Sequence, residues 1–265
     1  MPVNRPTPQS HYYSGQGRLI IGERDPLTGK PLLLREVGNC TAVEITVATT
    51  KTDHKESMSG LRSIDLTLVT EKSATFTVTC ESLDLNNLAL GLWGEVLTAD
   101  VAPVADEVHP IAKGGFIALG GQAVTAVTVE TVEATPTPLV EGTDYFLDPD
   151  FGTIRFSDDV DLPAVVAPAV PQVTVSYTPG ANVKVLHGLT QLKAPERFVR
   201  FEGVNTVDGE LVLVEIPRAS FEPLQNLGLI NEELGSFEMT GTVLLDNLIT
   251  EGSKFFRQTY IKPSE

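Results

Sequence analysis

The chain has 265 residues, which is enough for one large domain or two small ones with an ample core. Apolar residues make up 42% of the sequence, a share that is typical of globular proteins and excludes a disordered chain. With 35 acidic and 19 basic residues the formal net charge is −16, and no Lys/Arg run supplies the positive surface that a nucleic-acid-binding protein needs.

The N-terminal residues and the cysteines indicate where the chain is made. Residues 1–16 are polar and lack the apolar segment of a signal peptide. No stretch approaches the roughly 18 consecutive apolar residues of a membrane-spanning helix, so we expect no membrane partner. Cys40 and Cys80 do not have the spacing of a disulfide framework or a metal site, and we expect free thiols in a protein folded in a reducing cytoplasm.

The N-terminal half alternates apolar and polar residues, a pattern that predicts strands with one buried face. In the strongest of them Val43, Ile45 and Val47 alternate with polar residues. Thr49–Gly60 is polar and mixed in charge, which predicts a long loop. The strands expected in this half are Arg18–Ile21, Leu32–Leu34, Gly38–Val47, Ile64–Thr70 and Lys72–Cys80.

One helix is expected between Ser82 and Gly94. Its apolar residues fall at helical spacing and form a single stripe: Leu85, Leu88, Ala89 and Leu92. Ser82 or Asp84 can cap its start, and Gly94 can end it.

The composition changes near Val101, where Ala, Val, Pro and Thr begin to dominate. We interpret residues 111–183 as an inserted β-module, flanked by a main body of residues 18–110 and 184–251. Residues 1–17 form an N-terminal arm and residues 252–265 a C-terminal extension. Many short strands with one or two short helices predict a mainly β fold, either a β-sandwich or a partial barrel.

The residues that carry chemistry are scattered. The four histidines are far apart in sequence, and none has metal-ligand spacing. The acidic cluster around Asp148 and Asp158 lacks the ligand order of a calcium loop. No nucleophile, phosphate-binding or dinucleotide-binding motif is present. We therefore expect no catalytic residue, no metal, no cofactor and no enzymatic activity.

Several segments, in this order, resemble the major tail tube proteins of bacteriophages with long, non-contractile tails. The resemblance covers roughly residues 18–95 and 185–250, and the middle module departs from it. It is carried by Gly38–Ile45, His54–Gly60, Asn87–Gly94, Arg200–Thr206, Leu211–Arg218 and Glu238–Leu244.

The resemblance implies a structural virion protein. Members of that family form hexameric rings whose inner sheets join into one continuous β-barrel, and stacked rings make the tube that conducts phage DNA into the host cell. By resemblance the chain is located in the virion tail after synthesis in the bacterial cytoplasm. Its partners would be copies of itself, a tape-measure protein, a tail terminator and distal tail or tip proteins, with DNA only passing through the lumen.

Two sets of residues follow from the resemblance. The loop after the first core strand is expected to contact the next ring through Lys51, Asp53, His54, Lys55, Glu56, Ser57 and Met58. An acidic lumen that repels phosphate is expected from Glu44, Glu71, Glu202, Glu210 and Glu215, although these residues are equally consistent with solvated outer faces of strands.

Two other readings remain open. One is an Ig-like or adhesin-like β-sandwich that serves as a binding module on a particle surface, which suits the Pro- and Thr-rich middle segment. The other is a carbohydrate hydrolase with paired carboxylates, which the single tryptophan, Trp93, does not favour because sugar clefts use aromatic platforms.

Overall fold

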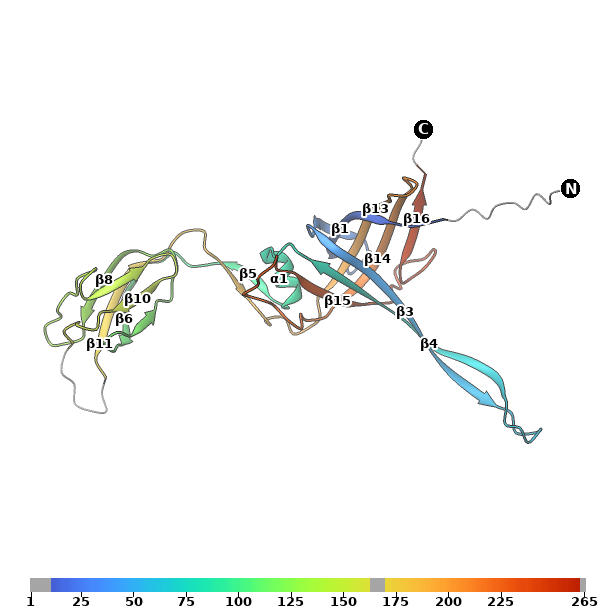
Figure 1. Cartoon of the computed structure of the whole chain (residues 1–265), viewed down its shortest axis with the longest axis horizontal. Helices are drawn as coiled ribbons and strands as arrows, with labels where there is room; N and C mark the ends of the chain where they lie inside the picture. The colour runs from blue at the N-terminus through green and yellow to red at the C-terminus, as the bar shows by residue number, and fades with distance from the viewer. Residues whose placement is uncertain (1–10, 163–169, 263–265) are drawn as a thin grey trace. The chain divides into compact units, whose positions relative to one another are not determined.

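The computed structural model describes residues 11–162 and 170–262. Within these ranges the chain forms sixteen strands and one helix, so the prediction of a mainly β protein is confirmed. It divides into two compact units (Figure 1): unit 1 comprises Met1–Glu95 and His187–Glu265, and unit 2 is Val96–Leu186. Each unit has a hydrophobic core of its own.

Unit 1 is built around one eight-stranded antiparallel sheet. The strand order is β2-β1-β13-β14-β15-β4-β3, and β16 pairs with the part of β14 that β15 leaves free. None of the sheets in the described ranges closes into a barrel. The strands of unit 1 are β1 (Gly15–Arg24), β2 (Pro31–Glu36), β3 (Cys40–Lys55), β4 (Ile64–Cys80), β13 (Glu196–Asn205), β14 (Leu211–Phe221), β15 (Phe237–Val243) and β16 (Arg257–Ile261).

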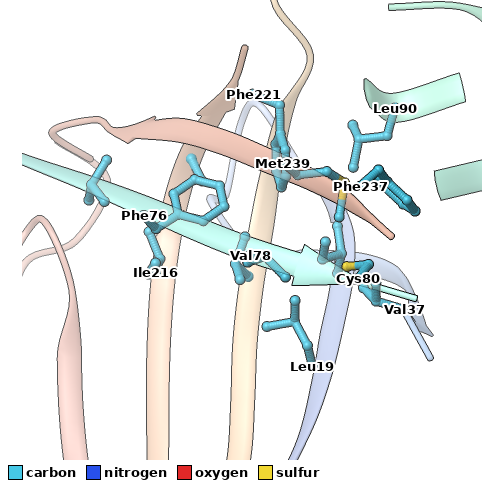
Figure 2. Packing of buried hydrophobic residues seen from close by; sticks show 14 of the residues in the cluster. Leu19, Val37, Phe76, Val78, Cys80, Leu90, Ile216, Phe221, Phe237 and Met239 are labelled. Carbon is cyan, nitrogen blue, oxygen red and sulfur yellow. The ribbon is translucent and has the colours of Figure 1, made fainter. Parts of the chain in front are cut away.

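The core of unit 1 lies on one face of this sheet (Figure 2). Phe76 and Phe221 meet edge to face with ring centroids 4.9 Å apart, a favourable geometry for aromatic pairs. Gly241 is the partner of Phe76 on β15, and a Cβ there would lie 2.4 Å from the Phe76 ring, so glycine is required. Leu19 of β1 and Ile45 of β3 line one hollow, so both ends of the sheet contribute to the same interior.

The single described helix, α1 (Leu85–Gly91), lies inside the range predicted for it. Asp84 caps it by accepting a hydrogen bond from the Asn86 backbone N–H at 2.6 Å. Leu90 packs into the core near Phe237 (Figure 2). The buried Asn87 amide donates to the Val37 carbonyl at 2.8 Å, which ties the helix to the segment after β2.

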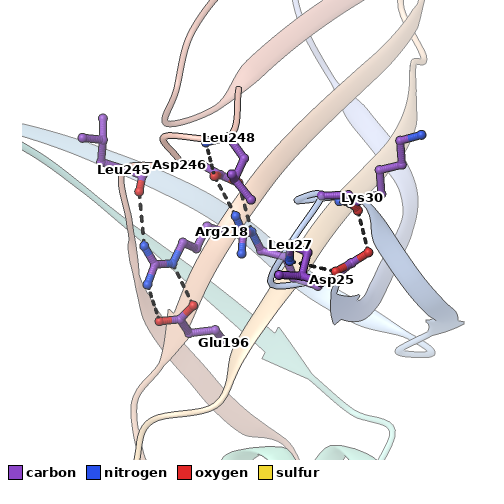
Figure 3. A network of polar contacts seen from close by, with 10 residues as sticks. Asp25, Leu27, Lys30, Glu196, Arg218, Leu245, Asp246 and Leu248 are labelled. Carbon is purple, nitrogen blue, oxygen red and sulfur yellow. Dashed lines mark hydrogen bonds and ion pairs between the residues drawn. The ribbon is translucent and has the colours of Figure 1, made fainter. Parts of the chain in front are cut away.

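Ion pairs fasten the segment after β15 to the sheet. Arg24 donates two hydrogen bonds to Asp246, at 2.9 and 2.7 Å, and the Asp246 side chain is only 1% exposed. Arg218 makes a two-pronged contact with Glu196 at 2.7 Å and also donates to the Leu245 carbonyl (Figure 3). Because buried charges are costly unless they are paired, these contacts hold the polypeptide in one arrangement.

Unit 2 is a small β-sandwich with two three-stranded sheets. Apolar residues of both sheets, such as Ile154 and Phe156 on one and Val173 and Val175 on the other, form its core. Outside these sheets β5 (Glu95–Thr98) pairs with β12 (Lys184–His187). The two sheets consist of β7 (Phe116–Ala118), β10 (Thr153–Phe156) and β9 (Tyr145–Asp148), and of β6 (Val104–Pro110), β11 (Gln172–Thr178) and β8 (Thr125–Thr131).

Two local predictions are wrong. The expected loop Thr49–Gly60 is strand as far as Lys55, because residues with polar side chains on both faces still pair with β4. The two strands expected over residues 64–80 are one strand of 17 residues. Part of the C-terminal extension is a sheet strand, β16, and the last residues of the N-terminal arm belong to β1; residues 1–10 lie outside the described ranges.

No helix in the described part of the chain is long and apolar enough to cross a membrane.

Candidate functional site

The hairpin of β3 and β4 has two halves with different surroundings. In the half near the core, Thr75–Cys80 of β4 lies between β3 and Phe237–Thr242 of β15. Beyond Ala74 the same two strands continue to Lys55 and Ile64, and among the described residues they pair only with each other. Figure 1 shows this distal half extending beyond the other strands of unit 1.

The distal half exposes a row of apolar side chains. Ile64, Leu66 and Leu68 alternate along β4 with other residues. Leu66 is 59% exposed and Leu68 is 58% exposed. Val47 on β3 and Met58 at the tip are exposed as well. A two-stranded hairpin is marginally stable in water, and exposed apolar residues add to the cost of leaving this one uncovered.

The tip of the hairpin is ordered by its own polar groups. Glu56 accepts hydrogen bonds from the backbone N–H groups of Met58 and Ser59, both at 2.8 Å, and from the Ser59 hydroxyl. The Ser59 hydrogen bond is the main reason that the pKa of Glu56 lies below its ordinary value. His54 Nδ1 lies 2.6 Å from the Asp65 carboxylate across the hairpin.

The structure brings the seven predicted contact residues together on this distal half. Lys51, Asp53, His54 and Lys55 lie on β3, and Glu56, Ser57 and Met58 lie at the tip. Asp53 accepts a hydrogen bond from the Thr67 hydroxyl at 2.7 Å.

The five glutamates predicted for an acidic lumen do not form one group. Glu44 and Glu71 are exposed on the β3–β4 hairpin, and Glu210 is half-buried beside the turn before β14. Glu202 is half-buried, and Glu215 is buried.

Glu202 and Glu215 belong instead to a ladder of alternating charges across five strands. Arg18 contacts Glu36 and Glu202, and Arg200 contacts Glu202 and Glu215. Arg257 of β16 also pairs with Glu215. These carboxylates are therefore neutralised by arginines, and this face of the sheet carries balanced charge.

Within residues 11–162 and 170–262, no three His, Cys, Asp or Glu side chains are grouped so that they could hold a metal ion.

Sequence reasoning missed that Ile64, Leu66 and Leu68 are exposed. The alternation of these residues is the same as that of Phe76, Val78 and Cys80, so nothing in the pattern separates a covered face from an uncovered one. The edge strand β16 was also missed, because Arg257–Ile261 is short and mostly polar.

Comparison with known families assigns the sequence to a family but does not indicate an activity. Residues 12–259 match the model of a family described as "Protein of unknown function UCP028589". The chain belongs to this family. No curated protein matches the sequence.

Proposed function

We propose that this chain is a structural protein that assembles with copies of itself into stacked rings, as the tail tube proteins it resembles do. In this proposal the hexameric rings form the tail tube of a bacteriophage virion, and the tube conducts DNA. The family match neither supports nor opposes this function.

One observation carries the proposal: apolar residues on the distal half of the β3–β4 hairpin are not covered by any other described part of the chain. Exposure of Ile64, Leu66 and Leu68 to water costs free energy. A second molecule that covers these residues in the assembled state would recover that free energy. The hairpin is also continuous with the sheet, because the residues of β4 that follow the distal half enter the core. A projection with exposed apolar residues that is anchored in this way is suited to contact with a neighbouring subunit.

Unpaired strand edges support association between copies. In the described ranges β3 pairs only with β4, and β16 pairs only with β14, so each has a free edge of backbone N–H and C=O groups. Exposed edges invite pairing with another chain, and closure of a ring of subunits would remove them. Tyr260 and Ile261 of β16 are exposed beside one of these edges.

The inner surface of the proposed tube does not need positive charge, because DNA only passes through it. Arginines neutralise Glu202 and Glu215, so the acidic character of a lumen would come from Glu44, Glu71 and Glu210. A neutral or acidic wall offers phosphate no attractive contacts.

Negative-stain electron microscopy and sedimentation of the concentrated full chain test the proposal. We expect rings with six-fold symmetry or hollow tubes, and a sedimentation coefficient that rises with concentration. Addition of a preformed tail tip or a ring-sized seed provides a second condition, because tube growth can require an initiator. A chain that stays monomeric under both conditions contradicts the proposal.

The alternative, a binding module on a particle surface, is favoured for unit 2 by one row of side chains. Phe116, Arg155 and Phe146 are register partners on three adjacent strands of one sheet. Both phenylalanines are exposed, and the Arg155 guanidinium lies 5.8 Å from the centre of the Phe116 ring. Binding of the chain to host-cell envelopes, abolished by Phe116→Ser with Phe146→Ser, would support this alternative; equal binding by the variant would contradict it.

A further inference from the structure

Cys40 and Cys80 lie side by side at the base of the hairpin. Cys40 is the first residue of β3 and Cys80 the last of β4, and the two are register partners. Their Sγ atoms are 3.4 Å apart, and both are free thiols. Cys80 is fully buried against Val37 and Phe237 (Figure 2), whereas Cys40 is half-buried.

Cys40 and Cys80 lie directly opposite each other at the end of the β3–β4 ladder, next to a register shift between Cys40 and Ala42. The neighbouring residues Asn39 and Glu81 share a backbone hydrogen bond, from the Glu81 N–H to the Asn39 carbonyl at 3.0 Å. Residues that lie directly opposite each other on antiparallel strands have Cα atoms about 4.5–5.5 Å apart. That separation falls within the range of about 4.4–6.8 Å that disulfides span.

The two thiols differ in access and reactivity. Cys40 borders a hollow that is also lined by Tyr13, Gly17 and Asn39 and that opens to solvent. The hydrogen bond from Cys80 lowers the pKa of Cys40, and the same contact together with burial raises the pKa of Cys80. Cys40 is therefore the thiol that a small oxidant meets first, and Cys80 is placed to attack the product.

We propose that Cys40 and Cys80 form an intrachain disulfide when the protein meets a small-molecule disulfide such as oxidised glutathione. The Cys40 thiolate attacks one sulfur of the oxidant, which forms a mixed disulfide and releases one reduced thiol. The Cys80 thiol then loses its proton and attacks the Cys40 sulfur, which releases the second thiol. Two protein thiols are oxidised by two electrons, and one small disulfide is reduced to two thiols.

The cross-link would close a loop that contains the whole β3–β4 hairpin. It would join the base of both strands covalently and leave the distal half, with Leu66 and Leu68, unchanged. In the proposed function, on which this consequence rests, the bond would form after release from the reducing cytoplasm, so that a finished particle is more resistant to unfolding than a newly made chain. The formation of the bond itself does not depend on the proposed function.

Mass spectrometry of the reduced full chain in glutathione buffers of rising oxidised share tests the proposal. We expect the mass to fall by two hydrogens, the free thiols to fall from two per chain to zero, and a peptide that links Cys40 to Cys80. The thermal midpoint should rise by roughly 5–10 °C and return when a strong reductant is added.

Two variants separate the cross-link from independent modification. Cys80→Ser should stop at a stable glutathione adduct on Cys40, and Cys40→Ser should leave the buried Cys80 unmodified. The proposal is overturned if the wild-type chain acquires two glutathione groups, stays fully reduced in oxidised glutathione, or forms only links between chains. All of these outcomes are measured by mass spectrometry on single chains. A failure to form the disulfide can therefore be distinguished from a failure to form rings.

Discussion

The two halves of β4 have the same sequence pattern but differ in the burial of their apolar side chains. Phe76, Val78 and Cys80 alternate with threonines and are buried between β3, β15 and the rest of the core. Ile64, Leu66 and Leu68 alternate in the same way and face solvent. The comparison teaches that alternation identifies a strand and its apolar face, but that a second layer must exist before that face becomes a core.

The difference has a simple structural cause. β15 ends its pairing with β4 at Thr75, and no other strand in the described ranges continues beside residues 64–74. The distal half therefore depends on the pairing of two strands and on the hydrogen bonds at its tip. We interpret its apolar face as the part of the fold that a second copy completes.

The largest expected effect comes from truncating matched apolar residues in the two halves. Phe76→Ala should lower the free energy of unfolding by about 3–5 kcal/mol, because it removes a ring that is 1% exposed and leaves a cavity beside Phe221. Leu68→Ala should change it by less than about 0.5 kcal/mol, because Leu68 has few contacts to lose. Urea unfolding of both variants measures the difference. Equal losses would remove the distinction between the halves.

The next largest effect is expected at the ion pair that anchors the segment after β15. Asp246→Asn should destabilise the chain by about 3 kcal/mol, because it leaves the Arg24 guanidinium buried without its counter-charge. Thermal unfolding measures the loss. Glu36→Gln is the matched control, since Glu36 pairs with the exposed Arg18 and its loss should cost little.

Acid should weaken the same anchor. Burial opposes ionisation of Asp246, but hydrogen bonds from Arg24 and the Leu248 backbone hold its pKa below the ordinary value of 3.8. The hydrogen bond from Arg218 does the same for Glu196, whose ordinary value is 4.5. A lowered folded-state pKa means that the unfolded chain binds protons first, so stability is present above pH 4.5 and is lost as the pH falls below it.

Unfolding midpoints between pH 6 and pH 3 measure this acid effect. Asp246→Asn removes one of the two carboxylates, so the midpoint of the variant should fall less steeply with pH than that of the wild type. Identical slopes would show that the anchor does not contribute to acid sensitivity.

The smallest effect on stability, and the most informative one for function, is expected on the distal apolar face. Leu66→Lys with Leu68→Lys should leave the free energy of unfolding within about 0.5 kcal/mol of the wild-type value, because both side chains are exposed. The same variant should abolish concentration-dependent sedimentation. Thr67→Lys adds a charge on the opposite face, where Asp53 can pair with it, and should still assemble.

The sequence predicted those parts of the fold that depend on local spacing. The helical spacing of Leu85, Leu88, Ala89 and Leu92 predicted the position of the helix, although the residues that the helix buries are Asn87, Leu90 and Gly91. The alternation up to Cys80 predicted the core face of β4. It failed over Thr49–Lys55, where polar side chains on both faces look like a loop and only pairing with β4 makes a strand.

Contacts between distant residues were not predictable from spacing. The Arg24–Asp246 pair joins residues 222 positions apart, and the Cys40–Cys80 contact depends on the register of β3 against β4. The candidate contact residues were found because the resemblance marked them as one segment. The exposure of Leu66, which is the register partner of His54, required the structure.

Hydroxyl-radical footprinting of the wild-type chain at low and high concentration tests the central claim most directly. The account predicts that Met58, Leu66 and Leu68 oxidise rapidly in the monomer and are protected in the fraction that sediments as an assembly, while Leu27, exposed on the turn between β1 and β2, serves as the reference. Unchanged oxidation of Leu66 and Leu68 in a fully assembled sample would contradict it.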